Sequence, residues 1–238
     1  PDPRRILVIG VGSGGTPWGT LISPRTEEVV AIEIVGSVLD TLRQIAAERP
    51  EGVIAALLAD PRLRLAHDDG RRALARRDSL YDVNEADAIL PQSSHSGLLY
   101  SREFLEQVRR RLAPGGLFVQ WAPSYGVAET FAAVFPHAVW IRPSNILIGG
   151  NDPFEADPAA IAARLADPAV IAHLQRGSPA VTPRLLQAFG RERAFVWRPG
   201  DPRPPAMLTD LFPRDEFFVN NRVEYPKAPA EAPLTAWR

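Results

Sequence analysis

The sequence predicts an α/β protein with a central, mostly parallel sheet that is covered by helices on both faces. Short apolar runs alternate with segments whose apolar residues recur at helical spacing, and this alternation is typical of parallel sheets. A glycine-rich turn directly follows the first apolar run, at residues 10–15. Two later runs, at 138–141 and 146–148, predict a C-terminal antiparallel hairpin that closes the sheet.

The individual elements follow from the same patterns. Strands ahead of the hairpin are expected at 6–9, 29–34, 63–65, 81–87 and 117–119. Helices are expected at 38–48, 103–112, 157–165, 168–174 and 185–189. Asp157 and Pro158 have the residue types of an N-cap and a first helical turn, and Thr16 is a candidate N-cap after the glycines.

The pattern changes after Gly150. We therefore expect a ligand-binding domain over residues 1–150 and a helical and extended appendage over 151–238, packed on the same domain. The chain starts Pro1-Asp2-Pro3, which is not a natural initiation, so we expect it to be cut from a longer protein.

Composition restricts the classes of function. Of the 238 residues, 45% are apolar and 23% charged, as in an ordinary globular protein. The formal net charge of -1 argues against a nucleic-acid partner, and short arginine runs are interpreted as solvated helix faces. The chain has no cysteine, which excludes thiolate metal sites and fits a cytoplasmic protein. No apolar run is long enough to span a membrane, so we expect no membrane contact from this chain.

Ligands of parallel sheets bind outside the carboxyl ends of the strands, so the residues that end each strand are the candidate site. The turn Gly10-Val11-Gly12-Ser13-Gly14-Gly15 permits close approach of a ligand to the backbone. Glu33 ends the second strand, where a carboxylate can accept both hydroxyls of a ribose. The same spacing suits nicotinamide enzymes, so these residues alone do not identify the cofactor.

The third strand ends in His67-Asp68-Asp69-Gly70. The Asp69 carboxylate can accept the amino group of an adenine, or it can cap the helix that follows, and the two roles are compatible.

The fourth strand carries polar residues, Asn84 and Glu85, where a central strand should be apolar. Asp87 ends it, so its carboxylate could orient or deprotonate an incoming amine; the alternative is a loop-capping aspartate. A polar, turn-rich segment at 91–97 follows, in which His95 is either a proton carrier or a solvated side chain. No hydrolase, zinc or phosphate-binding motif is present, and no metal is expected.

These segments together resemble the spermidine synthase (polyamine aminopropyltransferase) family. The resemblance runs from residue 4 to 149 and is carried by the segments 5–16, 30–34, 67–70, 81–87, 99–104 and 108–121. The tail at 209–217 also resembles the end of bacterial spermidine synthase-like proteins, including some that are fused to transporter-like halves.

The resemblance implies a Rossmann-like methyltransferase fold with an S-adenosyl cofactor as the substrate. It implies Asp87 as the catalytic residue. The cofactor-binding residues that it implies are Gly10, Gly12, Ser13, Gly14, Glu33, Asp69 and Gly70. We expect Tyr81, His95, Tyr100 and Gln120 to be substrate-binding residues; of these, Tyr81 and Gln120 match positions near the family's site.

The sequence departs from the family pattern at two acidic positions. Ser13 stands where the family has an aspartate that binds the amine of decarboxylated S-adenosylmethionine, and Leu90 stands where it has a second aspartate after the fourth strand. The family's small N-terminal β-domain, which also mediates dimers, has no counterpart in this sequence.

Three functions are considered in view of this resemblance and of the departures from it. The first is a transferase that moves an aminopropyl group from decarboxylated S-adenosylmethionine, or uses S-adenosylmethionine, with a small-molecule amine as the acceptor. The second is an S-adenosylmethionine-dependent methyltransferase, which the loss of the aspartate at Ser13 favours because the methionine carboxylate would be repelled by an acid there. The third is a non-catalytic binding module of a larger membrane-linked protein. A homodimer is left open.

Overall fold

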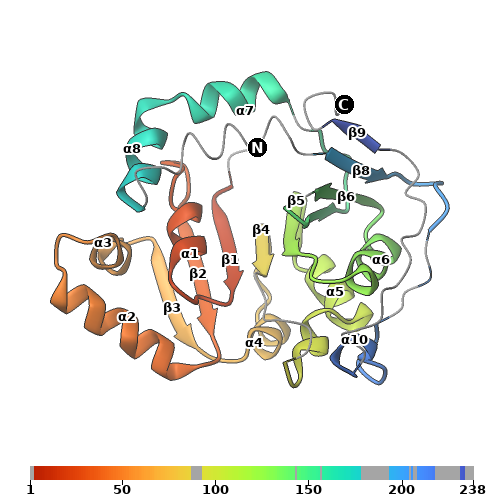
Figure 1. Cartoon of the computed structure of the whole chain (residues 1–238), viewed down its shortest axis with the longest axis horizontal. Coiled ribbons are helices and arrows are strands. Elements are labelled where there is room, and N and C mark those ends of the chain that lie inside the picture. Colours follow the sequence, from red (N-terminus) through yellow and green to blue (C-terminus); the bar gives the residue numbers. More distant parts are fainter. Residues whose placement is uncertain are drawn as a thin grey trace.

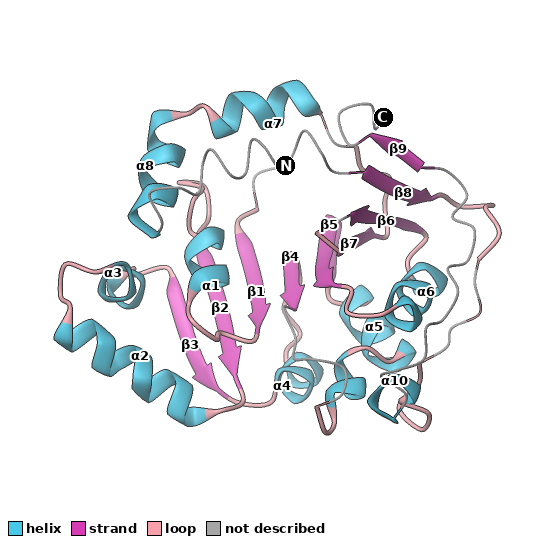
Figure 2. Cartoon of the chain, viewed as in Figure 1, coloured by secondary structure: helices cyan, strands magenta, loops and turns pink. Residues whose placement is uncertain are grey.

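The computed structural model describes residues 3–86, 93–142, 144–155, 157–177, 193–203, 205, 208–217 and 231–233. Within these residues the strands form one sheet in the order β3-β2-β1-β4-β5-β7-β6-β8-β9, with helices around it (Figure 2). The strands are β1 (Arg5–Ile9), β2 (Glu28–Glu33), β3 (Leu63–His67), β4 (Tyr81–Ala86), β5 (Leu112–Trp121), β6 (His137–Arg142), β7 (Ile146–Gly150), β8 (Arg193–Trp197) and β9 (Glu231–Pro233). The helices are α1 (Gly15–Thr20), α2 (Gly36–Glu48), α3 (Val53–Ala59), α4 (Gly70–Arg76), the 3-10 turn η1 (Ser96–Leu99), α5 (Arg102–Arg109), α6 (Tyr125–Val134), α7 (Pro158–Leu165), α8 (Pro168–Gly177) and α10 (Arg214–Phe217).

The first five strands in the chain are parallel, as predicted. Ile9 at the end of β1 pairs with Ile32 of β2 and with Ala86 of β4, so the carboxyl ends of these three strands are level. Their arrowheads point to one edge of the sheet, where α4 lies (Figure 1). The candidate residues that end these strands are therefore gathered along one edge.

The predicted antiparallel hairpin is confirmed, but it does not close the sheet. β6 and β7 are antiparallel, and β7 pairs antiparallel with β5. β8 and β9 then extend the sheet beyond the hairpin, so the part of the chain after Gly150 contributes strands as well as helices. The helix expected at 185–189 lies outside the described residues.

Alternation along β1 divides the apolar core between the two faces of the sheet. Ile6 and Val8 belong to a cluster that includes side chains of α2 and α3. Leu7 and Ile9 belong to a larger cluster with side chains of α4, α5 and α6. A β1 that is buried on both faces explains why its sequence is a continuous apolar run without polar alternation.

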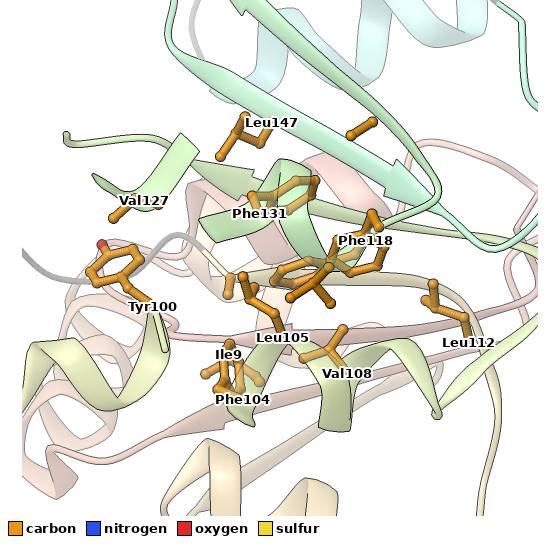
Figure 3. Close-up of a cluster of buried hydrophobic side chains, with 14 of the residues drawn as sticks. Ile9, Tyr100, Phe104, Leu105, Val108, Leu112, Phe118, Val127, Phe131 and Leu147 are labelled. Carbon is orange, nitrogen blue, oxygen red and sulfur yellow. The ribbon is translucent and has the colours of Figure 1, made fainter. Parts of the chain in front are cut away.

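Aromatic side chains form the centre of the larger cluster (Figure 3). The Phe118 ring on β5 lies 5.7 Å from that of Phe131 and 5.8 Å from that of Phe135, measured between ring centroids. The Phe104 ring of α5 meets Phe118 edge-on at 6.2 Å. These contacts fix α5 and α6 against the sheet.

Side-chain caps set where several helices begin. Asp157 accepts hydrogen bonds from the backbone N–H groups of Ala159 and Ala160, which confirms the predicted start of α7. The prediction that Thr16 caps the helix after the glycines is wrong. Gly14 occupies that N-cap in the left-handed conformation, with no side-chain cap, because φ of +84° is accessible to glycine.

Helix α6 carries a buried carboxyl group. Glu129 is 9% exposed, and its Oε2 has no hydrogen-bond partner in the described part of the chain. Burial raises the pKa of Glu129, nearby Arg214 opposes the rise, and Asp215 adds to it. The ionised form of Glu129 is therefore disfavoured in the folded state.

Glu129→Gln should raise the stability of the protein at pH 7 and have little effect near pH 4. The pKa of Glu129 is raised in the folded state. The contribution of its carboxyl group to stability is therefore fully present below the unfolded-state pKa of about 4.3, and it is lost as the pH rises through the folded-state pKa. Urea unfolding at both pH values measures the difference, with Glu51→Gln at an exposed position as the control. A Glu129→Gln variant that is less stable than the wild type at pH 7 would contradict this interpretation.

Candidate functional site

A cavity of about 700 Å³ lies at the carboxyl edge of β1 and β2. Among the described residues, four segments that are far apart in the chain line it: the glycine turn, the end of β2, the start of α4 and the turn around η1. Their residues are Ile9 to Ser13 with Gly15 and Thr16, then Ile32 to Ile34, then Asp69 to Arg71, and finally Ser94, His95, Leu98 and Leu99. This volume is in the range of small-molecule sites.

The glycine turn needs glycine at three positions for conformational reasons. Gly10, Gly12 and Gly14 have φ values of +97°, +51° and +84°. A Cβ at Gly12 would meet no atom within 4 Å, so backbone conformation is the requirement there. A Cβ at Gly14 would lie 2.9 Å from Leu57 Cδ2. Gly10 and Gly12 line the cavity, whereas Gly14 faces α3 and is outside the lining.

The Glu33 carboxylate supports this turn directly. The side chain lies at the end of β2 in a residue that is 7% exposed. Its Oε2 accepts hydrogen bonds from the N–H groups of Val11 at 2.9 Å and Gly12 at 3.3 Å, and its Oε1 accepts one from the N–H of Val35 at 2.8 Å. Glu33 therefore fixes the backbone of the turn in addition to lining the cavity, a role that the sequence interpretation did not include.

Asp69 both caps α4 and lines the cavity. Its Oδ1 accepts a hydrogen bond from the N–H of Arg72 at 2.7 Å. Gly70 follows it, and a Cβ there would lie 2.4 Å from Ile9 Cγ2, so only glycine lets α4 approach the end of β1 this closely. The neighbouring Asp68 forms an ion pair with Arg72, whose hydrogen bond lowers the pKa of Asp68. The capping role that the sequence left open is thus present at Asp69.

The fourth side of the cavity is formed by the turn around η1. His95 precedes η1 in the left-handed conformation, with φ of +65°, and is exposed at the cavity. Tyr100, which follows η1, is 1% exposed and belongs to the large apolar cluster, outside the cavity lining. Gln120 on β5 donates from Nε2 to the backbone oxygen of Leu99 at 2.8 Å, so it supports a lining residue from behind.

Three other candidate residues have different outcomes. Ser13 lines the cavity. Tyr81 does not: it begins β4, whereas the cavity is level with Ala86 at the opposite end of that strand, and its side chain is in the core. Its placement therefore gives no support to a substrate-binding role. Asp87 lies outside the described residues, directly after the last residue of β4.

Arg71 is a lining residue that the sequence interpretation missed, because its arginine run was assigned to a solvated helix face. The guanidinium donates from Nη1 to Asp210 Oδ1 at 2.6 Å and from Nη2 to Asp210 Oδ2 at 2.5 Å. This pair lowers the pKa of Asp210, although burial of Asp210 opposes the effect. The Arg71 side chain is 23% exposed and paired with Asp210. The prediction of a solvated helix face is therefore wrong for Arg71.

The described residues contain no group of three or more His, Cys, Asp and Glu side chains with the geometry of a metal site. In the same part of the chain, every helix is too short or too polar to cross a membrane.

Comparison with known proteins places this site in a family. Residues 1–131 match the spermine/spermidine synthase domain. The polyamine aminopropyltransferase of Synechococcus sp. (strain JA-3-3Ab) is 28% identical over 174 residues, which are 66% of this chain and 54% of that protein. The polyamine aminopropyltransferase of Moorella thermoacetica is 35% identical over 119 residues, which are 50% of this chain and 40% of that protein. The chain thus spans about half the length of such relatives.

Solved structures agree on the fold. A spermidine synthase in complex with the transition-state analogue AdoDATO has a TM-score of 0.53 at 23% identity, over 64% of this chain and 56% of that one. Human methyltransferase-like protein 13 in complex with SAH has a TM-score of 0.52 at 22% identity, over 73% of this chain and 82% of that one. Both comparisons support a Rossmann-like methyltransferase fold. With its domain match over residues 1–131, the chain belongs to the spermine/spermidine synthase family.

Proposed function

We propose that this chain is a transferase that binds decarboxylated S-adenosylmethionine in the cavity and transfers its aminopropyl group to a small-molecule amine. The observation that carries the proposal is the convergence of Glu33, Asp69 and the glycine turn on one cavity at the edge where β4 ends. Family membership supports the class of reaction. A cytoplasmic location stays a prediction from the sequence, and a homodimer is left open.

Glu33 and Asp69 would bind the adenosyl half of the ligand. A carboxylate offers about four acceptor positions. Three N–H groups already occupy the carboxylate of Glu33, which leaves capacity for one ribose hydroxyl. Asp69 uses one oxygen to cap α4, and its other oxygen would accept the adenine amino group. Ile34, Leu98 and Leu99 would enclose the adenine ring with apolar surface.

The reaction would need little covalent chemistry from the protein, because the sulfonium is already an activated leaving group. The amine nitrogen would attack the carbon next to the sulfur, so that a C–N bond forms, the C–S bond breaks and methylthioadenosine leaves. We assign two roles to Asp87: it orients the amine, and it accepts the proton that the amine loses. The end of β4 supports this position, because Ala86 pairs with Ile9 directly before the glycine turn.

A methyltransferase that uses S-adenosylmethionine is the second candidate. The observation that favours it is Ser13, which lines the cavity where an aspartate would repel the methionine carboxylate. The charged groups of the described lining are Glu33, Asp69 and the paired Arg71, with His95 as a further titratable group. Ligand preference distinguishes the two candidates.

Calorimetry with three ligands tests the function. Methylthioadenosine, S-adenosylmethionine and its decarboxylated form share the adenosyl half, so all three should bind, and the decarboxylated form should bind more tightly than S-adenosylmethionine. The reverse preference would favour methyl transfer. A lack of binding of all three at millimolar concentration would refute both enzymatic proposals and leave the binding module.

Asp87→Asn should abolish transfer and leave the affinity for methylthioadenosine nearly unchanged. The amide keeps the shape of the side chain but neither accepts the amine proton nor balances its charge, and losses of about 10²–10⁴-fold are typical for a general base. Turnover with decarboxylated S-adenosylmethionine and a diamine, together with calorimetry, measures both effects. Wild-type turnover would remove Asp87 from the mechanism.

Glu33→Ala should weaken methylthioadenosine binding by about 1–3 kcal/mol and also lower stability, because the N–H groups of Val11, Gly12 and Val35 lose their acceptor. Glu28→Ala is the matched control, since Glu28 lies on the same strand and forms a partly exposed ion pair with Arg5. Calorimetry and thermal unfolding give the two quantities. Wild-type affinity in Glu33→Ala would exclude the ribose role.

A further inference from the structure

The turn around η1 is held in place by a segment from the far end of the chain. This tail segment, Leu208–Phe217, ends in α10 and lies against η1, α5 and α6. The turn supplies the cavity lining at His95, Leu98 and Leu99. The position of that side of the cavity therefore depends on contacts that are far away in sequence.

The tail segment is first anchored at Leu208, which is 1% exposed. Its N–H donates to Thr130 Oγ1 of α6 at 3.0 Å, and its backbone oxygen accepts from the N–H of Arg102, at the start of α5, at 2.9 Å. The anchor thus links the tail segment to the two helices that pack on the aromatic core.

Asp210 connects the tail segment to the cavity. Its carboxylate binds both terminal nitrogens of Arg71, and Arg71 Nη1 also donates to the backbone oxygen of Leu98 at 3.1 Å. One guanidinium on α4 therefore joins the tail segment to η1. The N–H of Asp210 donates to Glu103 Oε2 at 3.0 Å, which fixes Asp210 from the side of α5.

Glu216 makes the second connection. Its Oε1 accepts a hydrogen bond from the N–H of Gly97, within η1, at 2.7 Å. A Cβ at Gly97 would lie 2.4 Å from Pro213 Cβ, so the turn and the tail segment are in close contact over a residue without a side chain. The carboxylate of Asp215 accepts from the Ser124 hydroxyl, the N-cap of α6. The tail segment therefore contacts two elements at this edge of the sheet through acidic side chains.

We infer that the tail segment is a clamp on the cavity, and that Asp210 and Glu216 are positioning residues that hold η1 where it can enclose an adenosyl ligand. Neither side chain lines the cavity, so both act through Arg71 and the backbone of η1. The effect on ligand affinity rests on the proposed function, whereas the effect on the order of η1 does not.

Amide hydrogen exchange and calorimetry with methylthioadenosine test the clamp. Glu216→Ala removes the acceptor for Gly97, so exchange at Gly97 and Tyr100 should accelerate about tenfold and ligand affinity should fall about tenfold. Glu216→Gln keeps an acceptor oxygen and should restore most of both. Asp210→Asn should act as Glu216→Ala does. Glu106→Ala, on the exposed side of α5, is the control and should change neither.

Wild-type exchange of η1 in Glu216→Ala would overturn the clamp. So would equal losses in Glu216→Ala and Glu216→Gln, because a simple loss of charge would then explain both. If Asp210→Asn does not fold, the comparison at Glu216 decides the question by itself. If the wild-type chain does not bind methylthioadenosine, the proposed function fails, and exchange still decides whether the tail segment orders η1.

Discussion

The carboxylate of Glu33 accepts hydrogen bonds from the N–H groups of Val11, Gly12 and Val35, and the candidate site depends on this interaction. The glycine turn has three residues at positive φ, and such a backbone has many alternative conformations in the absence of constraints. A buried carboxylate that accepts backbone N–H groups stabilises one of them. The parallel register of β1 and β2 brings Glu33 within reach of the turn, and the same register aligns the end of β4 with both.

The parallel strands, the antiparallel hairpin and the cavity lining at Gly10, Glu33 and Asp69 could be predicted from the sequence, because apolar runs ending in glycines or acids are local signals. Helix α6 was missed, since most of its residues are buried and it has no polar face to give a helical period. The role of Glu33 as a hydrogen-bond acceptor for the glycine turn was also missed. A sequence pattern does not show which backbone N–H groups of a turn need a side-chain acceptor. Arg71 was misassigned for a related reason: its partner, Asp210, lies 139 residues away.

The two faces of the candidate site are built differently. The glycine turn, Glu33 and Asp69 come from the parallel half of the sheet, where the Glu33 carboxylate accepts hydrogen bonds from the backbone of the turn. The turn around η1 is also contacted by residues that are far away in the chain, namely Gln120, Arg71 and the tail segment. The two sides of the cavity can therefore change independently of one another, because different contacts hold them in place.

The central claim is that glycines and acids from distant segments converge on one adenosine. A titration of the ¹⁵N-labelled chain with methylthioadenosine, followed by amide resonances, tests it most directly. The account predicts saturable shifts concentrated at Gly10–Thr16, at Glu33–Val35 and at Asp69–Arg71. Shifts confined to other parts of the sheet, or no shifts at millimolar ligand, would contradict it.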